Sequence, residues 1–179
     1  RAMTQLFAFE IPLYLTTLTA ALLADSWSLS DVAAFYAARP VLLLVNLPGF
    51  AVALVTLMGK LERVPFDIPE AETEIVAGAF TEYSGRWLAL LHLAIDVEMV
   101  VGAALLAAVF LPLGLTAGPA VGMVAFFAKI FLIILILAVA RTIVARLRLD
   151  QMIAFCWKIM APVAGVQLLI NLLVKGLIL

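Results

Sequence analysis

The sequence predicts an all-α integral membrane protein, a single transmembrane domain of five helices. Its 179 residues are 66% hydrophobic and 13% charged, whereas soluble domains are about 45–50% apolar and about 25% charged. A core of this size could not bury so much apolar surface, so lipid must cover part of it. The apolar residues are also gathered into long runs that short charged segments separate.

Five apolar runs approach the roughly 20 residues that a helix needs to cross the hydrocarbon core. They are, in order, residues 2–24, 41–58, 87–113, 120–140 and 152–173. The first contains Gln5 and Glu10, and the second contains Asn46, Pro48 and Gly49, which predict a kink. The third run is separated from the fourth by the turn sequence PLGLTAGP, and the fourth from the fifth by the basic sequence RTIVARLRLD.

Lysine and arginine are distributed unevenly between the two sets of loops. One side would carry Arg1, Lys60, Arg63, Arg86, Arg141, Arg146 and Arg148, and the other only Arg39 and Lys175. Because loops rich in Lys and Arg stay in the cytoplasm, residues 59–86 are expected to face the cytoplasm. The expected location is the inner (cytoplasmic) membrane of the cell, crossed several times.

The composition argues against several classes of protein. A net charge of −1 disfavours a nucleic-acid partner. Cys156 is the single cysteine and His92 the single histidine, so we expect no disulfide within the chain and no metal site on it. The sequence contains no nucleophile or phosphate-binding motif, and we expect no catalytic residue and no bound cofactor. The chain starts at Arg1 without a signal segment, so we expect it to be part of a longer polypeptide.

Residues 59–86, the acidic loop, concentrate carboxylates between the second and third runs. These are Glu62, Asp67, Glu70, Glu72, Glu74 and Glu82. Asp67 can cap a helix over about 68–77, in which Asp67, Glu70 and Glu74 would share one face. Acids crowded in this way titrate as a coupled set, which suits proton movement. The alternative is a loop whose acids are simply solvated.

Ionisable residues also lie inside the predicted spans. Glu10 lies in the first span, Asp96 and Glu98 in the third, and Lys129 in the fourth. A charge near the bilayer centre costs roughly 2.5–3.5 kcal/mol, so such residues usually face a bundle interior or a water path. Asp96 and Glu98 would point about 200° apart around a helix. The alternative role for each acid is a hydrogen bond in helix packing.

Two pairings follow from these positions. His92 and Asp96 are four residues apart and could form an acid–base pair on one helix face. Lys129 and Lys158 need partners within the membrane, and the intramembrane acids are the natural candidates.

Three separated segments resemble signatures of one family. They are RAMTQLFAFE, ERVPFDIPEAETEIVAGAFTEYSG and RLRLDQMIAFCWKIMAP. They resemble the family of the H subunit (also called subunit 1) of respiratory complex I and its relatives in membrane-bound NiFe hydrogenases. The resemblance implies a fold of about eight transmembrane helices, of which this chain would be the last five. It also implies a position between a soluble redox arm and an ion-pumping membrane arm.

The resemblance assigns roles to individual residues. Glu10 matches the glutamate that closes the motif R-x-x-x-Q-x-x-x-[YF]-E, and Arg63 matches the arginine just before the PFD segment. Together with the acids and the lysine singled out above by their positions, this gives the residues expected in a proton path or in coupling: Glu10, Asp67, Glu70, Glu72, Glu74, Glu82, Asp96, Glu98 and Lys129. Those expected at an interface with the soluble arm are Arg63, Arg86, Arg146, Arg148 and Asp150.

Two departures from the family pattern favour the hydrogenase branch. Complex I sequences commonly read E-T-N-R where this chain has Lys60-Leu61-Glu62-Arg63, and they carry a glutamate near the position of Ile95. The continuation EYSGR also looks more like the hydrogenases.

The sequence-based prediction is therefore a membrane anchor and coupling subunit of an energy-converting hydrogenase, linking electron transfer to proton or sodium translocation. Expected partners are iron–sulfur and NiFe soluble subunits, antiporter-like membrane subunits and the lipid bilayer. The first alternative is a quinone-chamber subunit of a complex I-type quinone oxidoreductase, with quinone as the substrate. The second is an independent secondary transporter that binds its cargo at Glu10, Asp96 and Lys129.

Overall fold

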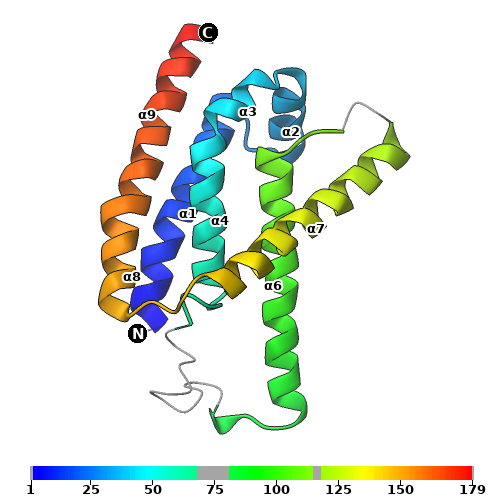
Figure 1. Cartoon of the computed structure of the whole chain (residues 1–179). Helices are drawn as coiled ribbons and strands as arrows, with labels where there is room; N and C mark the ends of the chain where they lie inside the picture. The colour runs from blue at the N-terminus through cyan, green and yellow to red at the C-terminus, as the bar shows by residue number, and fades with distance from the viewer. Residues whose placement is uncertain (1, 68–80, 115–117, 179) are drawn as a thin grey trace.

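The computed structural model describes residues 2–67, 81–114 and 118–178, and this part of the chain is built of helices (Figure 1). The elements are α1 (Ala2–Ala24), α2 (Leu29–Ala38), α3 (Val41–Val45), α4 (Leu47–Lys60), α6 (Arg86–Phe110), α7 (Pro119–Ile143), α8 (Leu149–Phe155), the π-helix η3 (Cys156–Met160) and α9 (Ala161–Ile178). The predicted all-α class is confirmed for the described residues.

Helix α1 lies at the centre of a bundle, between α4 on one side and α9 on the other (Figure 1). Its buried side chains include Ala8, Phe9 and Ala20, and small residues of this kind let neighbouring backbones approach closely. The closest approach is at Gly59 of α4, where a Cβ atom would lie 2.4 Å from the Phe9 ring. Glycine at this position is therefore a condition of the α1–α4 contact.

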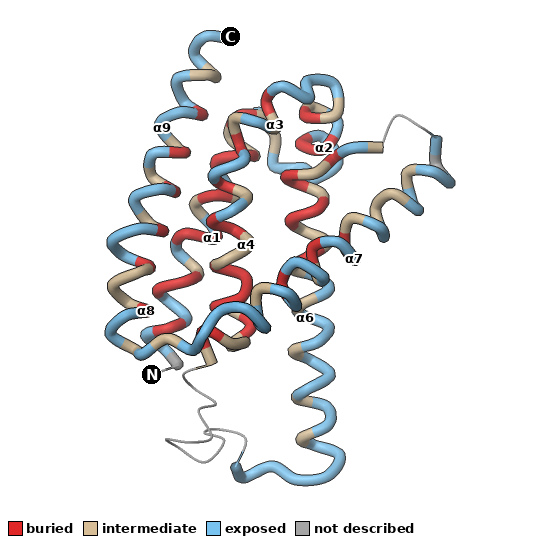
Figure 2. The backbone as a smooth tube through the Cα atoms, viewed as in Figure 1, coloured by how far each residue is buried: buried red, intermediate tan, exposed pale blue. Residues whose placement is uncertain are grey.

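Helix α6 stands beside α4, and α7 crosses α6 obliquely (Figure 1). The C-terminal half of α6 is partly buried through Ala103, Leu106, Ala107 and Phe110, whereas its N-terminal half is mainly exposed (Figure 2). This exposed half extends past the end of α4. The third predicted span therefore reaches beyond the α1–α4–α9 bundle.

Four helices are long and apolar enough to cross a membrane: Met3–Ala24, Arg86–Phe110, Ala120–Ile143 and Leu149–Leu177. They correspond to four of the five predicted spans. The remaining run, 41–58, is not one continuous helix, and here the prediction needs correction. It is divided at Asn46 into α3 and the 14-residue α4. At about 1.5 Å per residue, α4 alone is about 21 Å long, shorter than the hydrocarbon core of about 30 Å.

The expected disturbance around Asn46 is thus a break rather than a kink. Asn46 has φ −87° and ψ 0°, and Pro48, which has no N–H to donate, stands near the start of α4. Interrupted helices are tolerated in membrane proteins when other groups satisfy the freed backbone. Here Gln167 Nε2 donates to the carbonyl of Val45 at 2.9 Å.

A buried group of amide side chains, the amide cluster (Asn46, Gln167 and Asn171), holds this break against α9 and α1. Asn46 Oδ1 accepts hydrogen bonds from Gln167 Nε2 at 3.1 Å and from Asn171 Nδ2 at 2.8 Å. Asn171 Nδ2 also lies 3.1 Å from the carbonyl of Thr19. Most of the polar atoms brought into the apolar bundle thus pair with one another, which limits the cost of burying them, while Gln167 Oε1 is buried without a hydrogen-bond partner.

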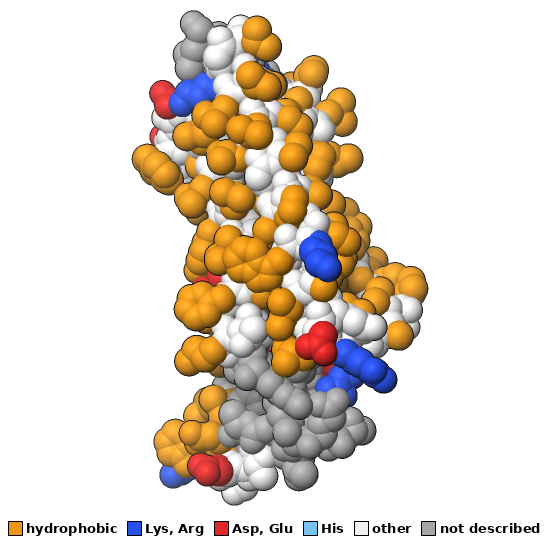
Figure 3. Space-filling model, turned by 90° about the vertical axis from the view of Figure 1, so that its left-hand side faces the viewer, with side chains coloured by type: hydrophobic (Ala, Val, Ile, Leu, Met, Phe, Trp, Pro, Cys, Tyr) orange, Lys and Arg blue, Asp and Glu red, His pale blue; other side chains and the backbone are white. Residues whose placement is uncertain are grey.

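The outer surface is largely apolar, as expected for a protein surrounded by lipid. Figure 3 shows hydrophobic side chains over most of one face, with a few charged side chains near the top, one basic side chain near the middle and others in the lower part. On α9 the exposed residues include Val166, Leu169 and Leu173, and on α7 they include Phe127 and Phe131. Because water would solvate such a surface poorly, this exterior favours a membrane environment.

The basic segments gather at one end of the bundle, the basic end, where α1 begins and α4 ends and where the chain passes from α7 to α8 (Figure 1). The opposite end carries Lys175, whose Nζ lies 2.6 Å from Asp25 Oδ1. This arrangement agrees with the predicted separation of the Lys- and Arg-rich loops from those that carry Arg39 and Lys175.

Candidate functional site

Three helices bring one lysine and two glutamates together near the basic end. Lys60, the last residue of α4, places its Nζ 3.6 Å from Glu10 Oε1 of α1 and 3.5 Å from Glu98 Oε1 of α6. Cations are favoured at a helix C-terminus, because the last carbonyls and the helix dipole attract positive charge. The three side chains form a Glu–Lys–Glu bridge between helices that are far apart in the sequence.

A second ion pair lies nearby. Arg63 Nη2, in the turn after α4, donates to Asp96 Oδ1 of α6 at 2.9 Å. Together with the Glu–Lys–Glu bridge, this pair forms the ion-pair cluster, which consists of Glu10, Lys60, Arg63, Asp96 and Glu98. Three of its members, Glu10, Asp96 and Glu98, were predicted site acids. The sequence predicted Arg63 at the interface and did not place Lys60 in the site.

Asp96 has a partner that the sequence did not predict. In the structure it pairs with Arg63, and the possible pair with His92 stays a prediction. Helix α6 extends past the end of α4 (Figure 1), and the Arg63–Asp96 pair joins it to the turn that follows α4. Asp96 and Glu98 contact different cations, Arg63 and Lys60, which both lie at the C-terminal end of α4.

A cavity of about 470 Å³ opens beside the Arg63–Asp96 pair, between α4, α6 and α7. Its wall is mostly apolar, with charge and hydroxyl groups supplied by Arg63, Asp96, Arg141 and Thr142. The apolar lining consists of Met58, Leu61, Met99, Ile134, Leu137 and Ala138. Its volume falls within the range of about 300–1,000 Å³ that is common for small-molecule sites. The sequence counted Arg141 only as a loop cation, since nothing in its pattern predicts that α7 leans across α6.

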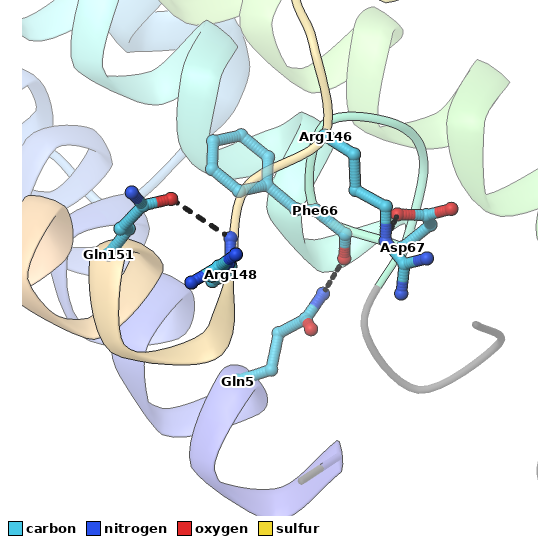
Figure 4. A network of polar contacts seen from close by, with 6 residues as sticks. All are labelled: Gln5, Phe66, Asp67, Arg146, Arg148 and Gln151. Atoms are coloured by element: carbon cyan, nitrogen blue, oxygen red, sulfur yellow. Dashed lines mark hydrogen bonds and ion pairs between the residues drawn. The ribbon is translucent and has the colours of Figure 1, made fainter. Parts of the chain in front are cut away.

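The start of the acidic loop is held by residues from distant parts of the chain (Figure 4). Gln5 of α1 donates from Nε2 to the carbonyls of Gly59 at 2.9 Å and Phe66 at 2.6 Å. The Leu147 N–H donates to the carbonyl of Pro65 at 3.0 Å. The three segments that carry the predicted signatures therefore meet at the basic end.

Two further contacts complete this anchor. Asp67 Oδ1 lies 3.0 Å from Arg146 Nε (Figure 4). The Phe66 ring lies 4.7 Å from the ring of Phe9 and 6.3 Å from that of Phe155, measured between centroids. Charge pairing and aromatic packing thus both attach the loop to its neighbours. Gln5 was noted within the R-x-x-x-Q motif but not predicted as a site residue; the motif was the signal that could have found it.

Lys129 does not join the acids, contrary to the prediction. Its Nζ donates to the carbonyls of Leu111 at 2.7 Å and Leu113 at 2.9 Å, where α6 has just ended. The end of a helix leaves carbonyls without intrahelical partners, and a lysine from α7 satisfies them here. The structure therefore places Lys129 in a helix cap remote from the basic end. Lys158 is exposed on η3.

The other predicted residues are distributed around the basic end. The Arg148 backbone N–H donates to Gln151 Oε1 at 3.2 Å at the start of α8, in whose first turn Asp150 is exposed. The guanidinium carbon of Arg86 lies 5.2 Å from the centre of the Trp87 ring. Glu82 is exposed ahead of α6.

Two predictions fall outside the described residues. They are the helix over 68–77 and the positions of Glu70, Glu72 and Glu74. Within the described ranges, no group of three His, Cys, Asp or Glu side chains is arranged to hold a metal ion.

The fold and the site define a multi-pass membrane protein with an ion-pair cluster and an apolar cavity near one end. The family model described as NADH dehydrogenase matches residues 1–172, and the chain belongs to this family. It is 39% identical over 183 residues to the H subunit of the NADH-quinone oxidoreductase of Anoxybacillus flavithermus, covering 99% of this chain and 54% of the relative.

Two further relatives are similar. The second H subunit of the NADH-quinone oxidoreductase of Syntrophobacter fumaroxidans is 37% identical over 177 residues, covering 98% of this chain and 51% of the relative. The H subunit of the enzyme of Carboxydothermus hydrogenoformans is 33% identical over 182 residues, covering 98% and 50%. The chain thus spans about half the length of the curated relatives it matches.

Proposed function

We propose that this chain is part of the membrane subunit of a complex I-type quinone oxidoreductase, where it forms one wall of a quinone site and couples quinone reduction to ion movement. The observation that carries this proposal is the apolar cavity beside the Arg63–Asp96 pair, close to the Glu–Lys–Glu bridge. The names of the relatives, which are subunits of NADH-quinone oxidoreductases, support it. They favour the quinone alternative over the hydrogenase prediction.

The residues of the cavity suit a quinone as substrate. A quinone ring is flat and apolar, and its carbonyl oxygens accept hydrogen bonds. Arg63, Arg141 and Thr142 supply donors, while Met99 and Ile134 belong to the apolar wall against which the ring or an isoprenoid tail would pack. Each group that a quinone needs is therefore present on the wall of one cavity.

The charged residues beside the cavity are placed to couple quinone reduction to ion movement. Reduction places negative charge on a quinone, and a guanidinium beside it would be drawn from Asp96 toward that charge. Asp96 would then lose part of its counter-charge, and the change would act on Glu98 and Lys60 close by. A redox event in the cavity would thus reach the Glu–Lys–Glu bridge electrostatically, without movement of a whole helix.

The distribution of basic residues supports an orientation with the basic end in the cytoplasm. In that orientation, the iron–sulfur subunits that supply electrons would dock near residues 61–67 and 141–148, and antiporter-like subunits would adjoin the chain within the bilayer. Helices α3 and α4 would cross the membrane together as the fifth, interrupted span.

A membrane-bound hydrogenase is the second candidate. It is favoured by Lys60, which stands where the complex I pattern commonly has glutamate, and by Ile95 at another glutamate position. In that assembly protons would accept the electrons, and the cavity would hold no quinone. An independent secondary transporter gains no support from the family to which the chain belongs.

The test is made on the complex purified with the full-length protein. We expect it to reduce a soluble quinone, and we expect the variant Arg141→Leu to raise the KM for quinone by about tenfold or more, because a charged hydrogen bond contributes about 1.5–3 kcal/mol. Arg39→Leu, at the other end of the bundle, is the matched control. Hydrogen production without quinone reduction would instead establish the hydrogenase.

A further inference from the structure

We propose that Lys60 is a gating cation that allows only one of two glutamates, Glu10 and Glu98, to hold a proton at a time, and that protons pass from Glu98 to Glu10. The inference rests on the proposed function, since it describes how ion movement would be controlled beside the cavity. It assigns a task to a residue that does not line the cavity and that departs from the complex I pattern.

The first observation is the near equality of the two ion-pair distances. Lys60 Nζ lies 3.6 Å from Glu10 and 3.5 Å from Glu98, so neither carboxylate holds the ammonium exclusively. Both distances are longer than those of a fully formed charged hydrogen bond, about 2.7–2.9 Å. The ammonium can therefore shorten one contact at the expense of the other by a small rotation of its side chain.

The second observation is that the backbone beneath Lys60 is firmly held. The Gly59 carbonyl accepts a hydrogen bond from Gln5 at 2.9 Å, and the Gly59 Cα packs so closely on Phe9 that a Cβ would not fit. Leu61, which follows, is buried. With both neighbours held, the end of the lysine side chain is the part that can move.

The third observation is the unequal exposure of the two acids. The Glu98 side chain is 46% exposed, whereas that of Glu10 is 23% exposed. The side chain of Lys60, which contacts both, is 25% exposed. Glu98 is therefore the more accessible of the two acids, and Glu10 lies deeper in the α1–α4 contact. This asymmetry sets the direction of transfer, with Glu98 as the entry residue.

The net charge of the Glu–Lys–Glu bridge is also consistent with the transfer of one proton at a time. Glu10, Glu98 and Lys60 together carry one negative charge when all are ionised, and Arg63 balances Asp96. Among the described residues, the other ionisable groups near this end include Arg141, across the cavity on α7, His92, one turn before Asp96 on α6, and the Asp67–Arg146 pair. One added proton therefore makes the Glu–Lys–Glu bridge neutral, and a second would leave the ammonium without a carboxylate.

The step is a simple proton transfer. A proton from water binds a Glu98 carboxylate oxygen and breaks the contact of that acid with Lys60. The proton then passes to Glu10, directly or through a water molecule, while Lys60, still an ammonium, moves from Glu10 to the Glu98 carboxylate that forms. With Lys60 beside it, Glu98 no longer takes the proton back.

The experiment uses the intact complex in proteoliposomes and measures the ions translocated for each electron transferred. We expect Lys60→Gln to lose translocation while electron transfer continues, and Lys60→Arg to retain it because the positive charge is kept. Lys175→Gln, which removes a lysine from the ion pair with Asp25 at the opposite end, is the matched control and should behave as the wild type.

Infrared difference spectra between the oxidised and reduced complex supply a second measurement. The wild type should show a protonated carboxyl band that is absent in Glu98→Gln. In Lys60→Gln this band should be present before reduction, because a carboxylate without its cation takes up a proton more readily.

Translocation at the wild-type ratio in Lys60→Gln would overturn the inference. So would loss of translocation in Lys60→Arg, since the shape of the lysine rather than its charge would then matter. A complex that does not reduce quinone would refute the proposed function but leave this test intact, because translocation can be measured with the acceptor that the complex does use.

Discussion

Arg63 Nη2 lies 2.9 Å from Asp96 Oδ1 and thereby joins the turn that follows α4 to helix α6. Both residues also line the cavity that α7 closes on its other side. The pair therefore connects the proposed quinone site to the end of α4, where Lys60 contacts the two glutamates. Its position makes it the first contact that a change of charge in the cavity would disturb.

Replacing Arg63 should affect substrate binding more than stability. The Arg63 and Asp96 side chains are 33% and 59% exposed, and ion pairs with such exposure contribute at most about 1 kcal/mol to stability. Arg63→Met should therefore leave the midpoint of thermal unfolding nearly unchanged but raise the KM for quinone about tenfold, because a charged donor is lost. Asp96→Asn, which keeps that donor, is the control and should change the KM much less. Equal effects of both variants would argue against a direct contact between Arg63 and quinone.

Gly59→Ala should destabilise the bundle. The new methyl group would lie 2.4 Å from the Phe9 ring, and inserting a group into a packed core typically costs about 1–3 kcal/mol. The midpoint of thermal unfolding in detergent should fall accordingly. Gly165→Ala in α9 is a matched control, because a Cβ there has no atom within 4 Å. A similar fall in both variants would show that loss of the glycine itself, rather than contact with Phe9, is responsible.

Asn171→Leu should weaken the attachment of α9 to the broken helix. It removes donors to Asn46 and Thr19 and leaves buried oxygen atoms with fewer partners, which costs about 1–3 kcal/mol. Thermal unfolding of the purified protein measures this loss. The neighbouring variant Leu172→Ala alters an exposed residue of α9 and should have a much smaller effect. Unchanged stability in Asn171→Leu would mean that the amide cluster is not a structural contact.

Lys129→Met should lower stability without changing coupling. The lysine caps the end of α6 through the carbonyls of Leu111 and Leu113, and hydrogen bonds of charged groups contribute about 1.5–3 kcal/mol. The unfolding midpoint should fall, while the number of ions translocated per electron stays at the wild-type value. Lys129→Arg keeps the charge and should restore most of the stability. Loss of translocation in correctly assembled Lys129→Met complex would return this lysine to the proton path.

Much of the fold could be predicted from the order of apolar and polar residues. Four of the five predicted spans correspond to long apolar helices, because the length of an uninterrupted apolar run decides whether a helix can cross lipid. The fifth, 41–58, was harder to predict. Asn46 and Pro48 indicated a disturbance, but the complete break depends on Gln167 and Asn171, more than 100 residues away, which satisfy the freed backbone and hold Asn46.

The acids of the candidate site were predictable, but Lys60, Arg141 and the contacts between the residues were not. Glu10, Asp96 and Glu98 were identified because a charge within an apolar run is costly and needs a reason. Their partners could not be deduced, because the height of α6 relative to α4 decides which cation each acid meets. The same limit explains the error at Lys129, whose partners are backbone carbonyls that carry no signal in the sequence.

The sequence by itself determined that this chain lies in a membrane, which of its loops share a side and which family it resembles. These properties follow from composition and local order, and they do not depend on how the helices pack. Only the tertiary structure decided that Lys60 stands between two glutamates and that Arg63, Asp96 and Arg141 share a cavity. Such contacts join residues on different helices, and their distances depend on packing at Gly59, Phe9 and similar points, where a single methyl group changes how closely two helices approach.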